Sequence, residues 1–222
     1  HVNRWLIALP LVSLAAMLAH ETAYMLPLAA LLIAGFESKA RGRSAVTGIS
    51  PLRLKALALM IAMFLLLIGY RSLALGGLHF GTDYPTENLF NNAGTALRHL
   101  WYFIDQTLLP LEPIVSDAWP VTRSWGSTEV AALLGFLLIA SATLLGLKLG
   151  HPSAFGVAWF LLWLTPGVGF FPSDHYHSSQ TLYLASWGLV FAVAYGIFVL
   201  WRPVGRLLAP GSEAVLYVPM II

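Results

Sequence analysis

Six apolar stretches divide the 222-residue chain, and polar segments separate them. A helix needs about 20 apolar residues to cross the hydrocarbon core of a bilayer, and tilting of the helix or thinning of the bilayer allows fewer. The sequence therefore predicts an all-α integral membrane protein with about six transmembrane helices, several of them short. The predicted spans are residues 5–19, 23–36, 56–75, 130–147, 154–164 and 181–201.

The composition supports this fold class. Hydrophobic residues make up 58% of the chain and charged residues 10%, whereas a soluble domain carries about 25% charged residues. These values exclude an ordinary soluble enzyme, a disordered chain and a nucleic-acid binder. The absence of cysteine removes disulfides, thiolate metal sites and cysteine nucleophiles. Because the chain starts at His1 with no signal-peptide pattern, we expect it to be part of a longer protein.

We expect a single membrane domain over residues 1–222. Its expected parts are two short helices in 1–36, one helix in 56–77, an outer loop with an interfacial helix in 78–128, three helices in 129–201 and a cytoplasmic tail in 202–222. The first two helices are expected to be separate, because one fused helix would bring His20 and Glu21 to the bilayer centre, where a carboxylate is costly. Thr22 is then a candidate N-cap of the second helix, which Pro27 should kink.

The basic residues predict the orientation of the six spans. Positively charged residues gather in cytoplasmic loops. With six spans, nine Lys and Arg residues fall on one side of the membrane and three on the other. We therefore expect an inner-membrane protein, of bacterial type, with both ends in the cytoplasm. Most acidic residues and histidines fall on the opposite, outer side, where we expect any chemistry. The nine are Arg4, Lys39, Arg41, Arg43, Arg53, Lys55, Lys148, Arg202 and Arg206, and the three are Arg71, Arg98 and Arg123.

The long outer loop contains one amphipathic segment. Its apolar residues recur at helical spacing, and its polar residues share the opposite face. This pattern predicts a helix lying in the interface between lipid and water. The apolar face consists of Leu97, Leu100, Trp101, Ile104 and Leu108, and the polar face of Arg98, Tyr102 and Asp105.

Two groups of residues are candidate sites on the outer side. His20 and Glu21 form either a tuned carboxylate that orients a hydroxyl or a cation, or a polar turn between two helices. Arg71 and Arg98 carry guanidinium groups suited to binding the phosphate of a polyprenyl lipid, and snorkelling to lipid headgroups is the alternative.

A third candidate site lies in the loop before the last span. Asp174, His175 and His177 could supply three ligands to zinc or another divalent metal ion, and a solvated polar loop is the alternative. His151, followed by Pro152, could ligate a tetrapyrrole pigment or simply form a turn. The chain contains none of the nucleotide-binding or zinc-protease motifs.

Three segments resemble the membrane region of the GT-C glycosyltransferases, in particular the protein O-mannosyltransferase-like group with transmembrane and tetratricopeptide-repeat regions. Residues 20–28 (HETAYMLPL) are similar to that group's Lys-Glu-x-(Gly/Ala)-x-x-Leu-Pro-Leu segment. Residues 154–166 (AFGVAWFLLWLTP) resemble its Ala-Phe-x-x-x-Trp-Phe segment, and residues 181–188 (TLYLASWG) its Tyr-Leu-Tyr-Leu-Pro-Ser-x-Gly helix start. Arg98 falls where the group has an Arg-bearing helix before a proline.

The resemblance covers most of the chain but only the later half of such an enzyme. It implies a fold with several short helices and a site on the periplasmic or lumenal face, where sugar passes with inversion from a polyprenyl-phosphate donor to a hydroxyl. Glu21 with His20 would be catalytic, and Arg71, Arg98, Gln180 and Tyr183 would bind the donor. The chain departs from the pattern at His20, where Lys is usual, at Gln180, where Arg is usual, and at Ala185, where Pro is usual. The family's acidic residue of the first outer loop has no counterpart.

The sequence leaves three functions open. The first is a GT-C-type transferase that uses a lipid-linked sugar, with a divalent metal as a candidate cofactor. The second is a non-catalytic membrane subunit, derived from such a fold, that packs against protein partners in a larger complex. The third is a transporter, because short helices broken by proline also build transport sites. The lack of paired charges inside the spans argues against ion coupling.

Overall fold

The computed structural model describes residues 2–19, 21–43, 48–75, 89–109, 121–168 and 179–208. Every regular element in these ranges is a helix, so the all-α class is confirmed for them. The elements are α1 (Val2–Ala19), the 3-10 helix η1 (Glu21–Met25), α2 (Leu26–Ala40), α3 (Pro51–Leu75), α4 (Leu89–Leu108), α5 (Ser127–Leu149), α6 (Pro152–Leu164) and α7 (Ser179–Leu208).

Four helical segments are long and apolar enough to cross a membrane, which confirms the prediction of an integral membrane protein. They are Thr22–Ala40, Pro51–Ala74, Ser127–Leu149 and Leu182–Arg202. The other two predicted spans coincide with shorter apolar helices, Ala8–Ala19 and Pro152–Leu164. Six crossings therefore stay a prediction.

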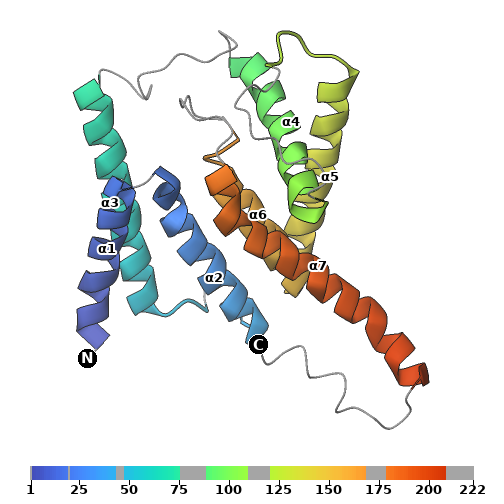
Figure 1. The fold of residues 1–222 in the computed structure, drawn as a ribbon. Coiled ribbons are helices and arrows are strands. Elements are labelled where there is room, and N and C mark those ends of the chain that lie inside the picture. Colours follow the sequence, from blue (N-terminus) through green and yellow to red (C-terminus); the bar gives the residue numbers. More distant parts are fainter. Residues whose placement is uncertain are drawn as a thin grey trace.

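The helices form two groups, joined by α2 (Figure 1). On one side α1 packs against α3, and on the other α6 packs extensively against α7 and also against α5, which contacts α4. Helix α2 contacts both α3 and α6. One end of the molecule, called here the upper end, is where α1, α3 and α6 end and α2, α4 and α5 begin, toward the top of Figure 1.

The junction between α1 and α2 is a break, as the sequence predicts. Helix α1 ends at Ala19, η1 follows, and α2 begins at Leu26. Two details are wrong: the N-cap of α2 is Met25 rather than Thr22, and Pro27 lies in the first turn of α2. A proline in the first turn loses no intrahelical hydrogen bond, so Pro27 starts the helix rather than kinking it.

Two glycines allow α6 and α7 to approach closely. A Cβ atom placed on Gly156 would lie 2.5 Å from the carbonyl oxygen of Gly188 and 3.0 Å from the Cβ of Ala192. Small residues at such a crossing bring helix backbones into van der Waals contact. The indole Nε1 of Trp159 also donates a hydrogen bond to the carbonyl oxygen of Leu184, at 3.1 Å. Among the described helices, α6 and α7 therefore pack against each other most extensively.

At the end of the molecule opposite the upper end, ion pairs and a tight turn connect the helices. Glu37, near the end of α2, forms ion pairs with Arg41 and with Arg53 of α3. Gly150 ends α5 with a φ of 74°, a conformation that glycine adopts without strain. The Lys39 side chain covers this glycine, since a Cβ there would be 3.3 Å from the Cγ of Lys39. The ends of α2 and α5 therefore meet.

The outward faces of the long helices are apolar. Between 11% and 33% of the residues in the four candidate spans are buried within the chain. Large apolar side chains stay exposed on α3, α5 and α7, among them Leu66, Leu73, Leu138, Trp187 and Leu200. Such surfaces are stable in hydrocarbon and costly in water, so these helices contact lipid.

Candidate functional site

Helix α4 runs in the same direction as the first turns of α5. The Asn91 side chain donates from Nδ2 to the carbonyl oxygen of Arg123, at 2.7 Å. Ten residues further along α4, the Trp101 Nε1 donates to the carbonyl oxygen of Ala132, at 3.1 Å. The second contact lies further along the chain than the first on both sides, so α4 and the start of α5 run parallel. Helix α4 covers the segment for which the amphipathic helix is expected, and the assignment as an interfacial amphipathic helix stays a prediction.

The apolar face of α4 is buried in the protein. Leu97, Leu100 and Phe103 lie in the core, while Leu108 at the end of the helix is exposed. Trp101 packs on Gly135 of α5, where a Cβ would collide with the indole ring. Because this face is buried, the opposite side of α4, which carries Arg98, is the side that remains accessible.

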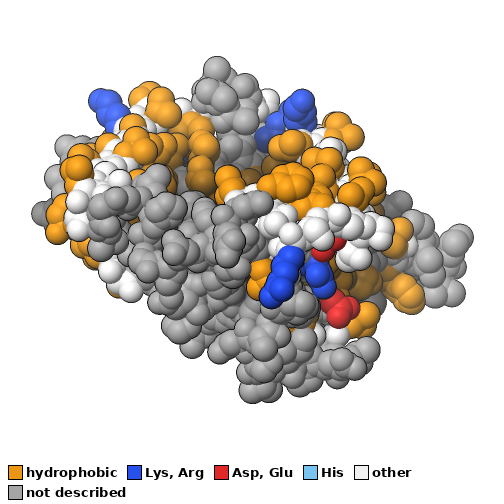
Figure 2. Space-filling view, turned by 90° about the horizontal axis from the view of Figure 1, so that it is seen from above, with side chains coloured by type: hydrophobic (Ala, Val, Ile, Leu, Met, Phe, Trp, Pro, Cys, Tyr) orange, Lys and Arg blue, Asp and Glu red, His pale blue; other side chains and the backbone are white. Residues whose placement is uncertain are grey.

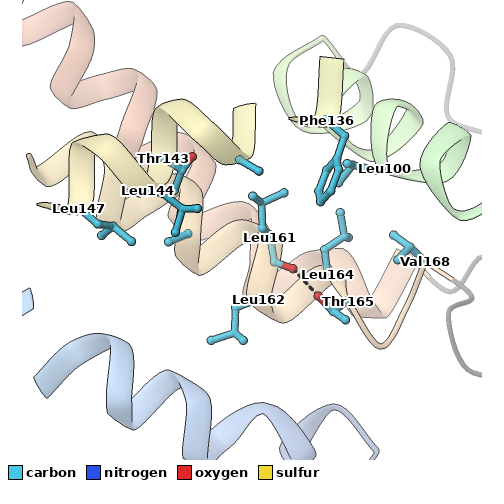
Figure 3. Close-up of a pocket in the computed structure, with 12 residues that line it drawn as sticks. Leu100, Phe136, Thr143, Leu144, Leu147, Leu161, Leu162, Leu164, Thr165 and Val168 are labelled. Carbon is cyan, nitrogen blue, oxygen red and sulfur yellow. Dashed lines mark hydrogen bonds between the residues drawn. The ribbon is translucent and has the colours of Figure 1, made fainter. Parts of the chain in front are cut away.

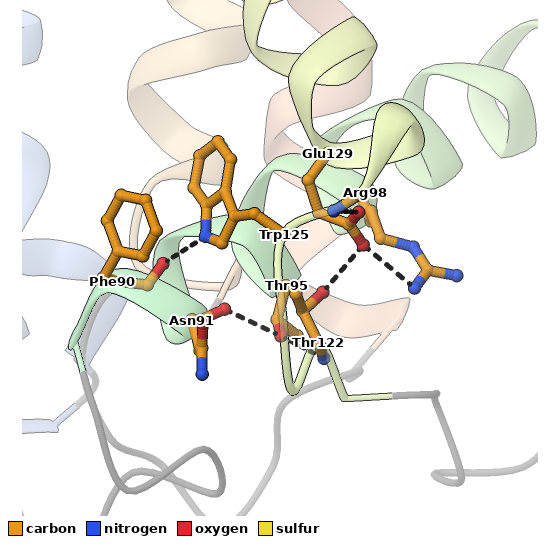
Figure 4. A network of polar contacts seen from close by, with 8 residues as sticks. Phe90, Asn91, Thr95, Arg98, Thr122, Trp125 and Glu129 are labelled. Carbon is orange, nitrogen blue, oxygen red and sulfur yellow. Dashed lines mark hydrogen bonds and ion pairs between the residues drawn. The ribbon is translucent and has the colours of Figure 1, made fainter.

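The start of α5 contains a buried carboxylate with three donors around it (Figure 4). Glu129 is 6% exposed. Its Oε2 accepts the backbone N–H of Gly126 at 2.9 Å, and its Oε1 accepts the Thr122 hydroxyl at 3.3 Å. Nη1 of Arg98, on α4, lies 3.5 Å from Oε1. A carboxylate at a helix N-terminus is also favoured by the helix dipole, so Glu129 joins α4 to the start of α5.

A second set of contacts holds the segment that precedes α5. The backbone N–H of Thr122 donates to the Thr95 hydroxyl at 2.9 Å. The Trp125 Nε1 donates to the carbonyl oxygen of Phe90 at 2.9 Å, and the two rings stack with centroids 4.5 Å apart. Gly94 makes this approach possible, since a Cβ there would lie 3.1 Å from the Cγ2 of Thr122. These contacts fasten the segment before α5 to α4, the helix that carries Arg98.

Arg98 keeps donors available beyond Glu129. Its side chain is 29% exposed, against 8% for that of Glu129. The guanidinium group carries five N–H donors, and the ion pair with Glu129 uses Nη1. Seen from the upper end, basic and acidic side chains lie next to one another in one area, with hydrophobic side chains beside them (Figure 2). The remaining donors suit an oxyanion such as phosphate.

An apolar groove runs along α5 and α6 (Figure 3). Its volume is about 350 Å³. Two threonines are its polar residues, and their hydroxyls donate within their own helices, Thr143 to Ile139 at 2.7 Å and Thr165 to Leu161 at 2.8 Å. The groove therefore suits a hydrocarbon chain. Its lining consists of Leu100, Phe136, Ala140, Thr143, Leu144, Leu147, Ala158, Leu161, Leu162, Leu164, Thr165 and Val168.

The ion pair joins α4 and α5, whereas the groove is lined mainly by α5 and α6, with Leu100 of α4 also in its lining. Leu100, at the upper end of the groove, follows Arg98 by two residues. Phe136 follows Glu129 by seven residues, which is two turns and about 10 Å along one face of α5. Residues two positions apart on a helix point to opposite sides, so Arg98 and Leu100 belong to different faces of α4, and Phe136, where the groove meets α5, lies two turns beyond Glu129.

Of the donor-binding residues expected from the sequence, Arg98 is the one that the structure places in this network. Arg71 lies near the end of α3, a helix that packs on α1 and α2, so its pairing with Arg98 stays a prediction. Gln180 lies in the first turn of α7. Tyr183, also on α7, is 71% exposed.

The catalytic and metal candidates fall mostly elsewhere. Glu21 is the first residue of η1, at the junction of α1 and α2. His20, Asp174, His175 and His177 lie outside the described residues. Within the described ranges, no three His, Asp or Glu side chains come close enough to hold a metal ion.

His151, the candidate pigment ligand, precedes α6 as its N-cap residue. Its ring meets the ring of Tyr195 edge-on, with centroids 5.5 Å apart. The contact links the α5–α6 turn to α7, and it is the packing arrangement expected of a turn residue.

Glu129 is not among the functional candidates that the sequence indicates. One signal was present: Gly126 and Glu129 have the spacing at which a side chain at the third helical position bonds back to the N-cap N–H. That spacing indicates a helix start, but it says nothing of the arginine 31 residues earlier.

Comparison of the chain with protein-family models, with curated proteins and with solved structures finds no match. The resemblance to GT-C glycosyltransferases therefore rests on the motifs in the sequence.

Proposed function

We propose that the chain is a membrane glycosyltransferase-like protein that takes sugar from a polyprenyl-phosphate donor and passes it to a hydroxyl acceptor on the outer face of the membrane. The observation that carries the proposal is the partly exposed guanidinium of Arg98 together with an apolar groove whose lining includes Leu100, two residues further along the same helix. A lipid-linked sugar phosphate has the same two parts, an anionic headgroup and a long hydrocarbon chain.

The headgroup would bind at Arg98. A planar guanidinium holds a phosphate through two parallel hydrogen bonds, and this geometry is the reason arginine is common in phosphate sites. Glu129 lies 3.5 Å from Nη1 and orients the group. The positive-inside pattern, read over six spans, supports placing this end of the helices on the outer face.

The hydrocarbon chain would occupy the groove. The groove has about 350 Å³, within the range of roughly 300–1,000 Å³ that ligand pockets show. Leu100 and Phe136 would contact the first part of the chain, and Leu147 a part further from the headgroup. Both threonine hydroxyls are engaged within their helices, so the groove offers the chain an apolar lining.

The transfer would break the bond from the anomeric carbon to the phosphate oxygen and form a bond from that carbon to the acceptor oxygen. Negative charge grows on the departing phosphate, and Arg98 would stabilise it. The acceptor loses a proton and needs a general base. Glu21 with His20 is the candidate for orienting the acceptor. The resemblance assigns the base to a loop upstream of the matching segments, and a divalent metal stays a candidate cofactor.

A non-catalytic membrane subunit is the second candidate. The observation that favours it is the large uncovered apolar surface: on α7 alone, Tyr183, Trp187 and Phe191 are all exposed. Lipid covers such a surface in a free protein, and a partner helix would cover it in a complex.

The test is binding and transfer with the purified protein in lipid nanodiscs and a radiolabelled polyprenyl-phosphate sugar. We expect saturable binding that Arg98→Gln abolishes. The matched control is Arg123→Gln, because Arg123 is exposed and its contact to Asn91 uses the backbone carbonyl oxygen. Binding that is absent from the unmodified protein, or unchanged in Arg98→Gln, would favour the subunit.

A further inference from the structure

The Glu129 carboxylate is held in place without help from Arg98. The Gly126 N–H binds one carboxylate oxygen at 2.9 Å, and the Thr122 hydroxyl binds the other at 3.3 Å. Thr122 is itself fixed through its backbone N–H to Thr95. A negative charge therefore stays at this point whether Arg98 turns toward it or toward a ligand.

The contact between Arg98 and Glu129 is looser than a charge-assisted hydrogen bond. Nη1 lies 3.5 Å from Oε1, whereas such bonds are about 2.7–2.9 Å long. The guanidinium can therefore accept a second anion on its exposed side. The guanidinium would then lie between the bound phosphate and the Glu129 carboxylate.

Donor and product of the proposed transfer differ in charge. The donor is a phosphodiester and carries one negative charge. The product is a phosphomonoester, which carries about 1.5 to 2 negative charges at pH 7 because its second pKa is about 6. A lone arginine would bind the product more tightly, since its attraction grows with the charge of the phosphate. The repulsion between a fixed carboxylate and the phosphate also grows with the charge of the phosphate. It therefore offsets the preference of the arginine for the monoester.

We infer that Glu129 is a positioning and selectivity residue that prevents the spent polyprenyl phosphate from occupying the site of the sugar-bearing donor. The inference rests on the proposed function, because it assigns Glu129 a role at the same Arg98 site. Glu129 touches neither sugar nor acceptor in this role. It acts through the charge that it places next to Arg98.

The test compares two lipids with the same chain at pH 7.5: polyprenyl phosphate, a monoester, and polyprenyl methyl phosphate, a diester without sugar. Dissociation constants are measured in nanodiscs of neutral lipid. For the unmodified protein we expect the two constants to lie within about threefold of each other. In Glu129→Gln the monoester should gain about three- to tenfold in affinity relative to the diester.

Two control variants separate charge from structure. Thr122→Val removes a hydroxyl donor to Glu129 at nearly constant volume and leaves the charge, so it should shift both constants by the same factor. Glu129→Asp keeps the charge and should retain the ratio of the unmodified protein. A purely structural role for Glu129 would weaken both lipids equally in Glu129→Gln.

The outcomes separate the two proposals. If neither lipid binds the unmodified protein, the proposed function fails together with the inference. If both bind and Glu129→Gln leaves their ratio unchanged, the inference alone fails. A preference for the monoester above about tenfold in the unmodified protein would also overturn the inference, and this measurement needs no variant.

Discussion

The guanidinium of Arg98 on α4 lies 3.5 Å from the carboxylate of Glu129 on α5, and Glu129 also receives the N–H of Gly126. One side chain thus caps the start of α5 and contacts the polar side of α4. The groove is lined further along these helices, since Leu100 follows Arg98 by two residues on α4 and Phe136 follows Glu129 by seven on α5.

Loss of the Glu129 carboxylate should destabilise this region. In Glu129→Ala the Gly126 N–H and the Thr122 hydroxyl lose their acceptor, and an unpaired donor costs about 1–3 kcal/mol. Denaturant unfolding in mixed micelles should show a decrease of this size. Asp105→Ala is the control, because Asp105 is an exposed acidic residue of α4. Equal stability of the two variants would contradict the structural role of Glu129.

The crossing of α6 and α7 should not tolerate a methyl group. In Gly188→Ala the new Cβ would meet the Phe160 backbone nitrogen and a Trp159 ring carbon, each at 2.8 Å. Overpacking of this kind costs about 1–3 kcal/mol. Gly196→Ala, on the same helix with nothing within 4 Å of the new Cβ, should leave the unfolding midpoint unchanged or raise it. The account of this crossing fails if both variants behave alike.

Filling the groove should block lipid binding without unfolding the protein. Ala158→Leu adds three carbon atoms to the lining of the groove, and we expect a several-fold loss of affinity for polyprenyl phosphate. Leu138→Phe is the control because Leu138 is exposed on α5 and does not line the groove. Both variants should elute as monodisperse protein. Unchanged affinity in Ala158→Leu would mean that the chain binds elsewhere.

The proposed orientation can be tested by labelling single cysteines, since the protein has none of its own. Ser50 lies in the segment between α2 and α3, and Ser124 in the segment between α4 and α5, and both are exposed. A membrane-impermeant maleimide added to intact cells should label Ser124→Cys and spare Ser50→Cys. The opposite pattern would reverse the orientation, and labelling of both would contradict the count of crossings.

The helices themselves were predictable from the sequence. A long apolar run has few alternatives to a helix, because a bilayer leaves backbone groups no other partners. This reasoning located α3, α5 and α7 and the break at Glu21. It failed at Thr22 and Pro27, because the 3-10 turn η1 delays the start of α2 by three residues, from the predicted residue 23 to Leu26. Local propensity does not reveal such a turn.

The candidate site was only half predictable. Arg98 was a candidate because its guanidinium group suits a phosphate, whereas Glu129 was only one of several acidic residues on the predicted outer side. Their contact depends on how α4 is packed against α5, which the fit of Trp101 on Gly135 helps to determine. The groove likewise requires three helices to meet. No periodicity along the chain encodes these relationships.

The most direct test of the central claim is photo-crosslinking with a polyprenyl phosphate that carries a diazirine in its chain, followed by peptide mapping. The account predicts that crosslinks concentrate on peptides containing Leu100, Phe136 and Leu161. It also predicts that unlabelled polyprenyl-phosphate sugar competes for them and that Arg98→Gln removes them. Crosslinks that spread over the exposed faces of α3 and α7, with no competition and no effect of Arg98→Gln, would contradict it.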